Sequence, residues 1–301
     1  MIRDAAADRS NLNSASARRL HRNCQFDKKT TFWLAFTHLG CLAAPFTFTW
    51  PAFWIFIALY ILTGGLGISM CYHRLLSHRS FKTPKAVEYG LAILGCMAAQ
   101  RSPVYWVARH RLHHAESDTD NDPHSPRHGF WWAHMIWTMM DLRVADENEF
   151  YQKYAGDLAR DPGHRWIQKT HELWPVLLAA ALFTAGGVPF LVWGFFVRTV
   201  VVYHFTWIVN SLGHRLGYKN YPTDDDSRNN GLIALLSFGD GWHNNHHAYP
   251  ALANHGHHRW WEIDLTYLAV RLMAFLGLAS NIHTRTQSEK NSADRKAALK
   301  A

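Results

Sequence analysis

The stretch WLAFTHLGCLAAPFTFTWPAFWIFIALYILTGGLGISM, residues 33–70, contains no Asp, Glu, Lys or Arg. A helix needs about 20 consecutive apolar residues to cross a bilayer, so this run is too long for one span and about right for two. FTFTWPAF in its middle supplies the break, because Pro51 favours a turn and the indole of Trp50 suits a membrane interface. We therefore predict a helical hairpin inserted in a membrane.

A second apolar run, residues 173–213, contains only one residue of formal charge, Arg198. It breaks at AGGVP, residues 185–189, which lies nearer its start, so the third span is expected to be short. A charge within a span is costly unless it faces protein or water, and we expect a structural partner for Arg198. The alternative is a soluble α-helical protein that buries both hairpins.

Charge asymmetry favours the membrane interpretation, because the turns of the hairpins are uncharged while the flanking segments are rich in Lys and Arg. By the positive-inside rule, both termini and the polar segments lie on the cytoplasmic side. The net charge of +8 suits an anionic membrane surface, and no nucleic-acid-binding motif accompanies it. We expect an all-α integral membrane protein with these parts: a basic tail (1–32), a membrane domain (33–281) with hairpins at about 33–70 and 173–213 and a cap from 71–172 and 214–281, and a second basic tail (282–301).

Clusters of histidine follow the apolar runs. The chain has 21 histidines, and many of them fall in HRLLSH (73–78), HRLHH (110–114) and GDGWHNNHH (239–247). The predicted topology brings all three clusters, and His214 after the last span, to one side of the membrane. They are therefore able to converge from separate parts of the chain.

The spacing within these clusters predicts a metal centre. On a helix, residues i, i+3 and i+4 span an arc of about 100°, so that adjacent histidines are able to point at two different metals. Neutral imidazole suits iron, zinc, copper or nickel, so spacing alone leaves the metal open. The histidines exceed the roughly four ligands of a tetrahedral zinc, and two metals are the simplest count. The four cysteines have no CxxC spacing, which argues against a disulfide framework or a Cys-ligated zinc.

The segments YHRLLSHRSFK, HRLHH, DNDPHSPRHGF, NSLGHRLG and GDGWHNNHH, in this order around two hairpins, resemble the membrane-bound fatty acid desaturase family. The similarity is greatest to the Δ9 acyl-CoA and acyl-lipid branch that includes stearoyl-CoA desaturase, and it covers about residues 33–279. It implies a di-iron centre with Asn210 near one metal through water. The histidines that match the family's ligands are His73, His78, His110, His113, His114, His214, His243, His246 and His247.

The resemblance also implies a bent apolar tunnel that selects the methylene group beside the metals. The residues that match the lining of its bend are Gln100, Trp106, Thr206 and Trp207. Asp240 stands where relatives often carry Glu, which affects a contact to a histidine rather than the ligand set. The acidic loop SDTDNDPH has two interpretations: Asp118, Asp120, Asp122 and His124 orient metal ligands, or they form a polar turn at Pro123. Similarly, Arg101, Arg109 and Arg111 either meet a phosphate-bearing head group or are membrane-surface charges.

The activity implied is O2-dependent insertion of a cis double bond, with Δ9 favoured, into a saturated acyl-CoA or acyl-lipid chain. An unactivated methylene has no acidic proton, so its hydrogen is removed by oxygen activated at a metal rather than by side chains. Reducing O2 to water takes four electrons, and forming the alkene gives two. Since no GxGxxG fingerprint is present, we expect the other two from an external donor such as ferredoxin or cytochrome b5. Zinc is able to occupy such a site in overexpressed samples.

Two other functions fit parts of the pattern. A related di-iron membrane hydroxylase uses the same metals, but NSxxH and the third cluster favour a desaturase. A membrane metal carrier would place ionisable residues near the midplane of its spans, where only His38 and His204 supply histidines here.

Overall fold

The computed structural model describes residues 24–142, 144 and 146–285, so most of the two predicted basic tails lies outside the described residues. The described part is mostly helical, as predicted, with one short antiparallel pair of strands, β1 (Cys24–Phe26) and β2 (Met140–Leu142). Cys41, Cys71 and Cys96 are free thiols. The helices are α2 (Lys28–Gly40), η1 (Cys41–Phe46), α3 (Trp50–Leu59), η2 (Tyr60–Ser77), α4 (Lys85–Met97), α5 (Pro103–Glu116), η3 (Pro126–His128), α6 (Phe130–His134), η4 (Ile136–Met139), α7 (Glu147–Arg160), α8 (Pro162–Thr170), α9 (Leu173–Leu191), η5 (Val192–Val197), α10 (Arg198–Ser211), η6 (Leu212–His214), α11 (Gly231–Leu236), α12 (His243–Ala248) and α13 (Leu265–Phe275).

The first apolar run breaks where predicted. The chain leaves η1 at Phe46 and starts α3 at Trp50, where the Thr49 side chain accepts a hydrogen bond from the backbone N–H of Ala52. Pro51 lies in the first turn of α3, where its missing N–H costs no helical hydrogen bond. The helix then continues without interruption through the π-helix η2 to Ser77.

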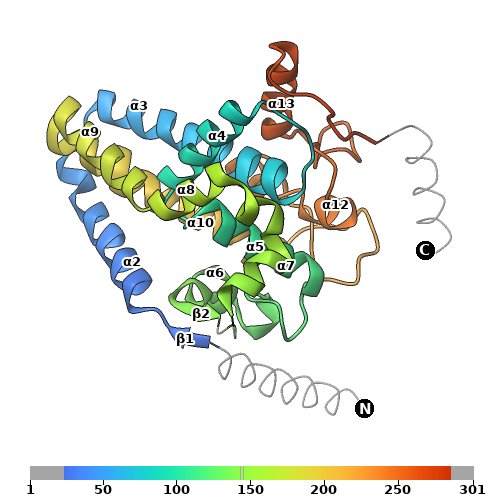
Figure 1. The fold of residues 1–301 in the computed structure, drawn as a ribbon. Coiled ribbons are helices and arrows are strands. Elements are labelled where there is room, and N and C mark those ends of the chain that lie inside the picture. The colour runs from blue at the N-terminus through green and yellow to red at the C-terminus, as the bar shows by residue number, and fades with distance from the viewer. Residues whose placement is uncertain (1–23, 143, 145, 286–301) are drawn as a thin grey trace.

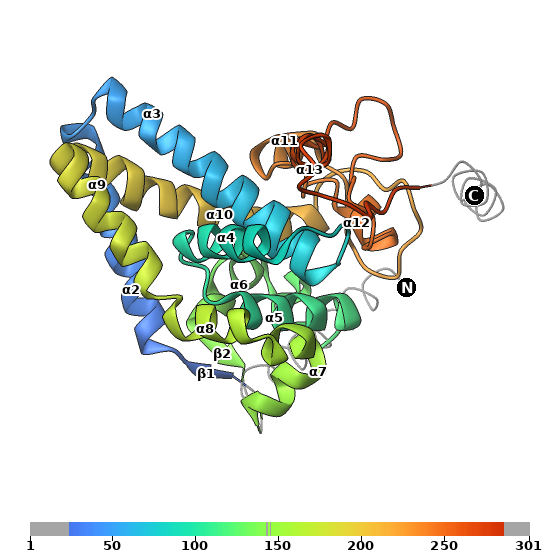
Figure 2. The same cartoon turned by 45° about the horizontal axis from the view of Figure 1, so that its top comes forward.

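The second apolar run reverses direction at Gly186 and Gly187, inside the predicted 185–189 break. Gly187 has φ of +64°, a conformation that glycine adopts without steric cost. Beyond this turn the chain runs back along itself, because a Cβ placed on Gly194 would lie 3.0 Å from the Leu182 side chain. Figures 1 and 2 show α2, α3 and α9 on one side of the molecule, with α10 in its middle.

These helices and the turns between them carry much of the exposed apolar surface of the described residues. Trp50–Ser77 and Leu173–His214 are long and apolar enough to cross a membrane, and in the most apolar window of the latter only 11% of the residues are buried. Phe46 is 88% exposed and Trp50 is 65% exposed. A core hairpin of a soluble protein would bury this surface, so the exposure argues for association with a membrane.

The remaining helices form a cap against the ends of the apolar helices. Helix α4 crosses η2 so closely that a Cβ on Gly67 would lie 2.6 Å from the backbone nitrogen of Gly95. Arg198 stabilises this arrangement from within the second apolar run. Its fully buried guanidinium donates to the carbonyl of Met97 at the end of α4 (2.7 Å) and to that of Gly194 (3.1 Å). The expected structural partner of Arg198 is therefore the backbone.

Candidate metal centre

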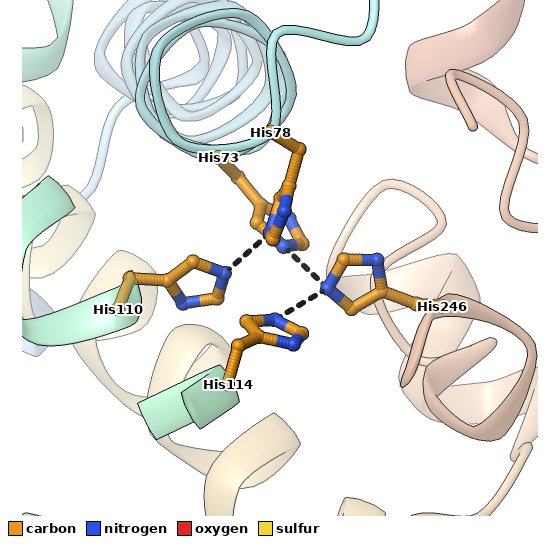
Figure 3. A group of neighbouring side chains, drawn as sticks. All are labelled: His73, His78, His110, His114 and His246. Atoms are coloured by element: carbon orange, nitrogen blue, oxygen red, sulfur yellow. Dashed lines mark hydrogen bonds between the residues drawn. The ribbon is translucent and has the colours of Figure 1, made fainter. Parts of the chain in front are cut away.

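The histidines of the three clusters and of NSLGH converge into two groups at the boundary between the apolar helices and the cap. Within each group all candidate ligand atoms lie within 4.8 Å of one another. Figure 3 shows the imidazole rings of the first group facing a common centre. The first group is His73, His78, His110, His114 and His246, and the second is His113, His214, His243 and His247.

Each HxxHH motif lies on one helix and divides between the two groups, as its spacing predicted. On α5, His110 and His114 are four residues apart and join the first group, whereas His113 joins the second. On α12 the division is reversed, with His246 in the first group and His243 beside His247 in the second. The two helices therefore bridge both candidate metal positions.

The HxxxxH motif relies on a wider helical turn. The predicted hairpin ends at residue 70, and the helix η2 continues beyond it to Ser77 and contains His73, with His78 as its C-terminal cap. The His78 N–H bonds to the His73 carbonyl at 3.2 Å, an i→i+5 bond of the π-helical kind. Because this wide turn brings residues five apart onto one face, the two rings lie 5.0 Å apart.

Buried or half-buried aspartates orient four of the histidines through their Nδ1 atoms. The distances to the nearest carboxylate oxygens are 3.0 Å for His73–Asp240, 2.9 Å for His113–Asp122, 2.8 Å for His214–Asp118 and 2.7 Å for His247–Asp225. When Nδ1–H donates to a carboxylate, the Nε2 lone pair is left to bind a metal. The acidic loop thus orients ligands through Asp118 and Asp122, while Asp120 is exposed.

The arrangement of ring nitrogens fits a bound cation in each group. His247 Nε2 is buried and has no hydrogen-bond partner among the described residues, although Nδ1 of the same ring bonds Asp225. His214 Nε2 lies 3.0 Å from His243 Nε2, and His73 Nε2 lies 3.0 Å from His246 Nε2. Since His73 and His214 give their Nδ1 protons to aspartates, their Nε2 lone pairs point into the groups. Imidazole donors of this kind suit iron, zinc, copper or nickel.

Burial keeps most of these histidines unprotonated, which is the form that binds metal. Desolvation, assisted by the positive charge of neighbouring imidazoles, lowers the pKa of His78, His110, His114 and His246 well below its ordinary value. Burial also lowers the pKa of His247 to about 4, against the opposing effect of Asp225.

A cavity of about 370 Å³ leads to the first histidine group and is lined by all four residues predicted to form the bend of the tunnel. Trp106 Nε1 donates to Gln100 Oε1 (3.2 Å), and Gln100 Nε2 donates to Thr206 Oγ1 (2.9 Å), while Trp207 also lines the cavity. A smaller cavity of about 50 Å³ shares Trp106, Thr206 and Asn210 with it and touches both histidine groups. The two cavities therefore pass beside both candidate metal positions.

Comparison with known proteins assigns the family. The family model described as fatty acid desaturase matches residues 48–275. The chain belongs to the fatty acid desaturase family. It is therefore an acyl desaturase, an oxidoreductase of lipid metabolism, and the family assignment disfavours a metal carrier or a hydroxylase.

The relatives of this desaturase differ in the bond they introduce and in the acyl carrier. The chain is 46% identical over 260 residues to the acyl-CoA 5-desaturase AL21 of Anemone leveillei, covering 84% of this chain and 80% of the relative. It is 45% identical over 255 residues to the sn-1 stearoyl-lipid 9-desaturase of Anabaena variabilis (84% and 92%). It is 46% identical over 253 residues to the chloroplastic palmitoyl-monogalactosyldiacylglycerol delta-7 desaturase of Arabidopsis thaliana (84% and 68%).

Several supporting residues of the desaturase site were not predicted. Asp225 lies in the run DDD, and the sequence of this run did not predict its hydrogen bond with His247. Arg74, beside His73, is fully buried and donates to Asp240 (2.7 Å) and Asp264 (2.9 Å). It also lies 3.0 Å from Nδ1 of His255, whose ring packs 4.3 Å from that of His246. The one signal available in the sequence was the arginine directly after a candidate ligand.

Proposed function

We propose that this protein inserts a cis double bond at Δ9 of a saturated acyl chain, using O2 and electrons from outside the chain. The observation that carries the proposal is the position of the two histidine groups beside a cavity lined by Trp106, Gln100 and Thr206. The Δ9 position is supported by the motif resemblance and by the similarity to a relative named as a 9-desaturase. Other relatives are named as 5-desaturases and 7-desaturases, so the position of the double bond is the first property to test.

The groups would hold two irons. His73, His78, His110, His114 and His246 would bind one, and His113, His214, His243 and His247 the other. Asn210 would lie near one of the two irons through water. When bound, the irons supply the O2 activation that removes hydrogen from a methylene group. O2 is the co-substrate, and zinc is expected to compete in overexpressed protein.

The residues that line the cavity would determine which methylene group of the acyl chain lies beside the irons. Trp106, Gln100 and Thr206 form a hydrogen-bonded bend that leaves the acyl chain one path, with Trp207 alongside. Fixing the chain in this way converts a bimolecular encounter into a positioned reaction and excludes water from it.

We also propose a multi-pass topology in which α2 with η1, α3 with η2, α9, and η5 with α10 form four spans. The domain is proposed as residues 33–281, with hairpins at about 33–70 and 173–213 and basic tails at 1–32 and 282–301. The distribution of Lys and Arg supports cytoplasmic termini and a cytoplasmic active site. A donor of the ferredoxin or cytochrome b5 type would dock on the cap.

The test is the fatty-acid profile of a host that expresses the chain, with double-bond positions mapped by mass spectrometry. We expect a new Δ9 monounsaturated acyl chain that is absent with His246→Ala, because that change removes a ligand of the first group. Hydroxy-acids in its place would refute desaturation, and a double bond at another carbon would refute Δ9 alone.

A further inference from the structure

The larger cavity reaches the surface between the starts of α2 and α9. Among its lining residues, Phe32 on α2 is 73% exposed and Val176 on α9 is 56% exposed. Lys29 and Glu172 stand beside them and form an ion pair of 2.5 Å that links the two helices across the opening. The mouth of the cavity therefore opens sideways, between two helices whose exposed apolar faces suit a bilayer interface.

Every Lys and Arg among the described residues that line this cavity has a carboxylate partner. Lys29 pairs with Glu172, and Arg101 pairs with Asp27 while also bonding Thr30. Arg109 lies 2.5 Å from Asp141 and stacks over the ring of Tyr105 at 3.7 Å. Arg111, the third candidate for a head group, bonds Asp157 at 2.8 Å instead. The lining of the cavity is thus balanced in charge, because each of its Lys and Arg side chains is held by a carboxylate.

The pairing of every lining cation with a carboxylate favours one of the two acyl carriers that desaturases use over the other. Coenzyme A carries several phosphate groups, and proteins bind phosphate with Arg or Lys donors that are free to receive it. A glycerolipid with a zwitterionic or glycosyl head group has no net charge, and its acyl chains already lie at the depth of the exposed side chains on α2 and α9. An acyl-CoA would have to displace three carboxylates from their cations, whereas such a lipid would displace none.

We infer that the substrate is an acyl chain esterified to a membrane glycerolipid of zero net charge, admitted laterally between α2 and α9. The inference rests on the proposed desaturase function and names its carrier. Trp33, which also lines the cavity next to Phe32, is of the residue type that favours the head-group level of a bilayer. The lipid's glycerol backbone would remain at this level while one chain follows the cavity toward the histidines.

The test compares two probes on the same iron-loaded protein in lipid nanodiscs, supplied with reduced ferredoxin. One probe is phosphatidylcholine carrying a labelled stearoyl chain, and the other is labelled stearoyl-CoA in discs free of acyltransferase. We expect the double bond in the phosphatidylcholine pool, with initial rates at least about tenfold above those on stearoyl-CoA. Equal or faster desaturation of stearoyl-CoA would overturn the inference and leave the desaturase function intact. Absence of product from both probes would overturn the proposed function itself.

Charge variants at the mouth supply an independent measurement. Glu172→Gln frees Lys29 on an exposed surface, and Asp141→Asn frees Arg109. Each is expected to raise kcat/KM for stearoyl-CoA about fivefold, the effect of one charged contact to phosphate, without a matching rise for phosphatidylcholine. The control is Glu149→Gln, which makes the same charge change at an exposed site on α7. An equal rise of kcat/KM for stearoyl-CoA in the control would show that the paired charges do not select the acyl carrier. The absence of a rise in both Glu172→Gln and Asp141→Asn would show the same.

Discussion

At the scale of single residues, the aspartates decide which ring nitrogen each histidine presents. Asp225→Asn should lower iron affinity about 10- to 100-fold, because the amide no longer accepts the Nδ1 proton of His247 in the same way. The measurement is iron per protein after dialysis against graded chelator. Asp224→Asn, an exposed neighbour in the same acidic run, is the matched control and should retain iron. Equal loss in both variants would mean that the loop, and not the hydrogen bond, is responsible.

The buried histidines also set a pH dependence. Their pKa values in the folded protein lie below that of an unfolded histidine, about 6.5, with His247 at about 4. As pH falls below 6.5, the unfolded chain takes up protons before the folded one does, so stability is lost. We expect the melting temperature of the iron-free protein to be level above about pH 7 and to fall as pH drops from 6.5 toward 4. His113, whose pKa is raised by Asp122 despite burial, titrates in the opposite sense but is outnumbered. A melting temperature that rises on acidification would contradict this assignment.

The ligands themselves were predictable because histidine spacing is a local property of the sequence. Their partners were not: the contacts of Arg74 with Asp240 and His255 join residues 166 and 181 positions apart. Nothing in the run DDD distinguishes Asp225 from its neighbours until the chain has folded. The sequence therefore predicted which histidines would be candidate ligands, and the fold was needed to learn what holds their rings in place.

At the scale of helices, Arg198 joins the second apolar run to α4. Arg198→Met keeps most of the side-chain volume but leaves the carbonyls of Met97 and Gly194 without this donor. The expected cost is about 2 kcal/mol of stability, visible as a lower melting temperature in detergent. Arg271→Met, at an exposed position on α13, is the control and should change little. If Arg198→Met and Arg271→Met have the same melting temperature, the Arg198 guanidinium contributes no stability.

Helix boundaries were predicted where a breaker residue marks them. Both breaks, at Pro51 and at Gly186–Gly187, came from residues with restricted or special backbone geometry. The predicted hairpin ends at residue 70, where the sequence becomes too polar for lipid, whereas the helix η2 continues to Ser77 because the cap buries these polar residues. The polarity of a sequence therefore indicates where contact with lipid ends, but it does not indicate where the helix itself ends.

At the scale of the whole molecule, the tunnel is assembled from segments that are remote in sequence. Thr206→Val removes the hydroxyl that receives the Gln100 amide while keeping the side-chain shape. We expect the rate to fall roughly tenfold, with double bonds spread over neighbouring carbons, because the bend no longer holds one methylene in place. Double-bond mapping of the product is the measurement, and Thr199→Val, buried on the same helix, is the control. A product with one unchanged double-bond position would show that Gln100 and Thr206 do not define the bend.

The contact between His73 and His246 has a consequence for the stage of biosynthesis at which the protein is able to bind metal. The two residues are 173 positions apart, so at about 5–20 residues per second a ribosome takes roughly 9–35 s to add the second after the first. During that interval neither histidine group is complete, so neither is able to bind a metal with its full set of ligands. Iron acquisition would then be a step of maturation, governed by the metal supply after translation has passed α12.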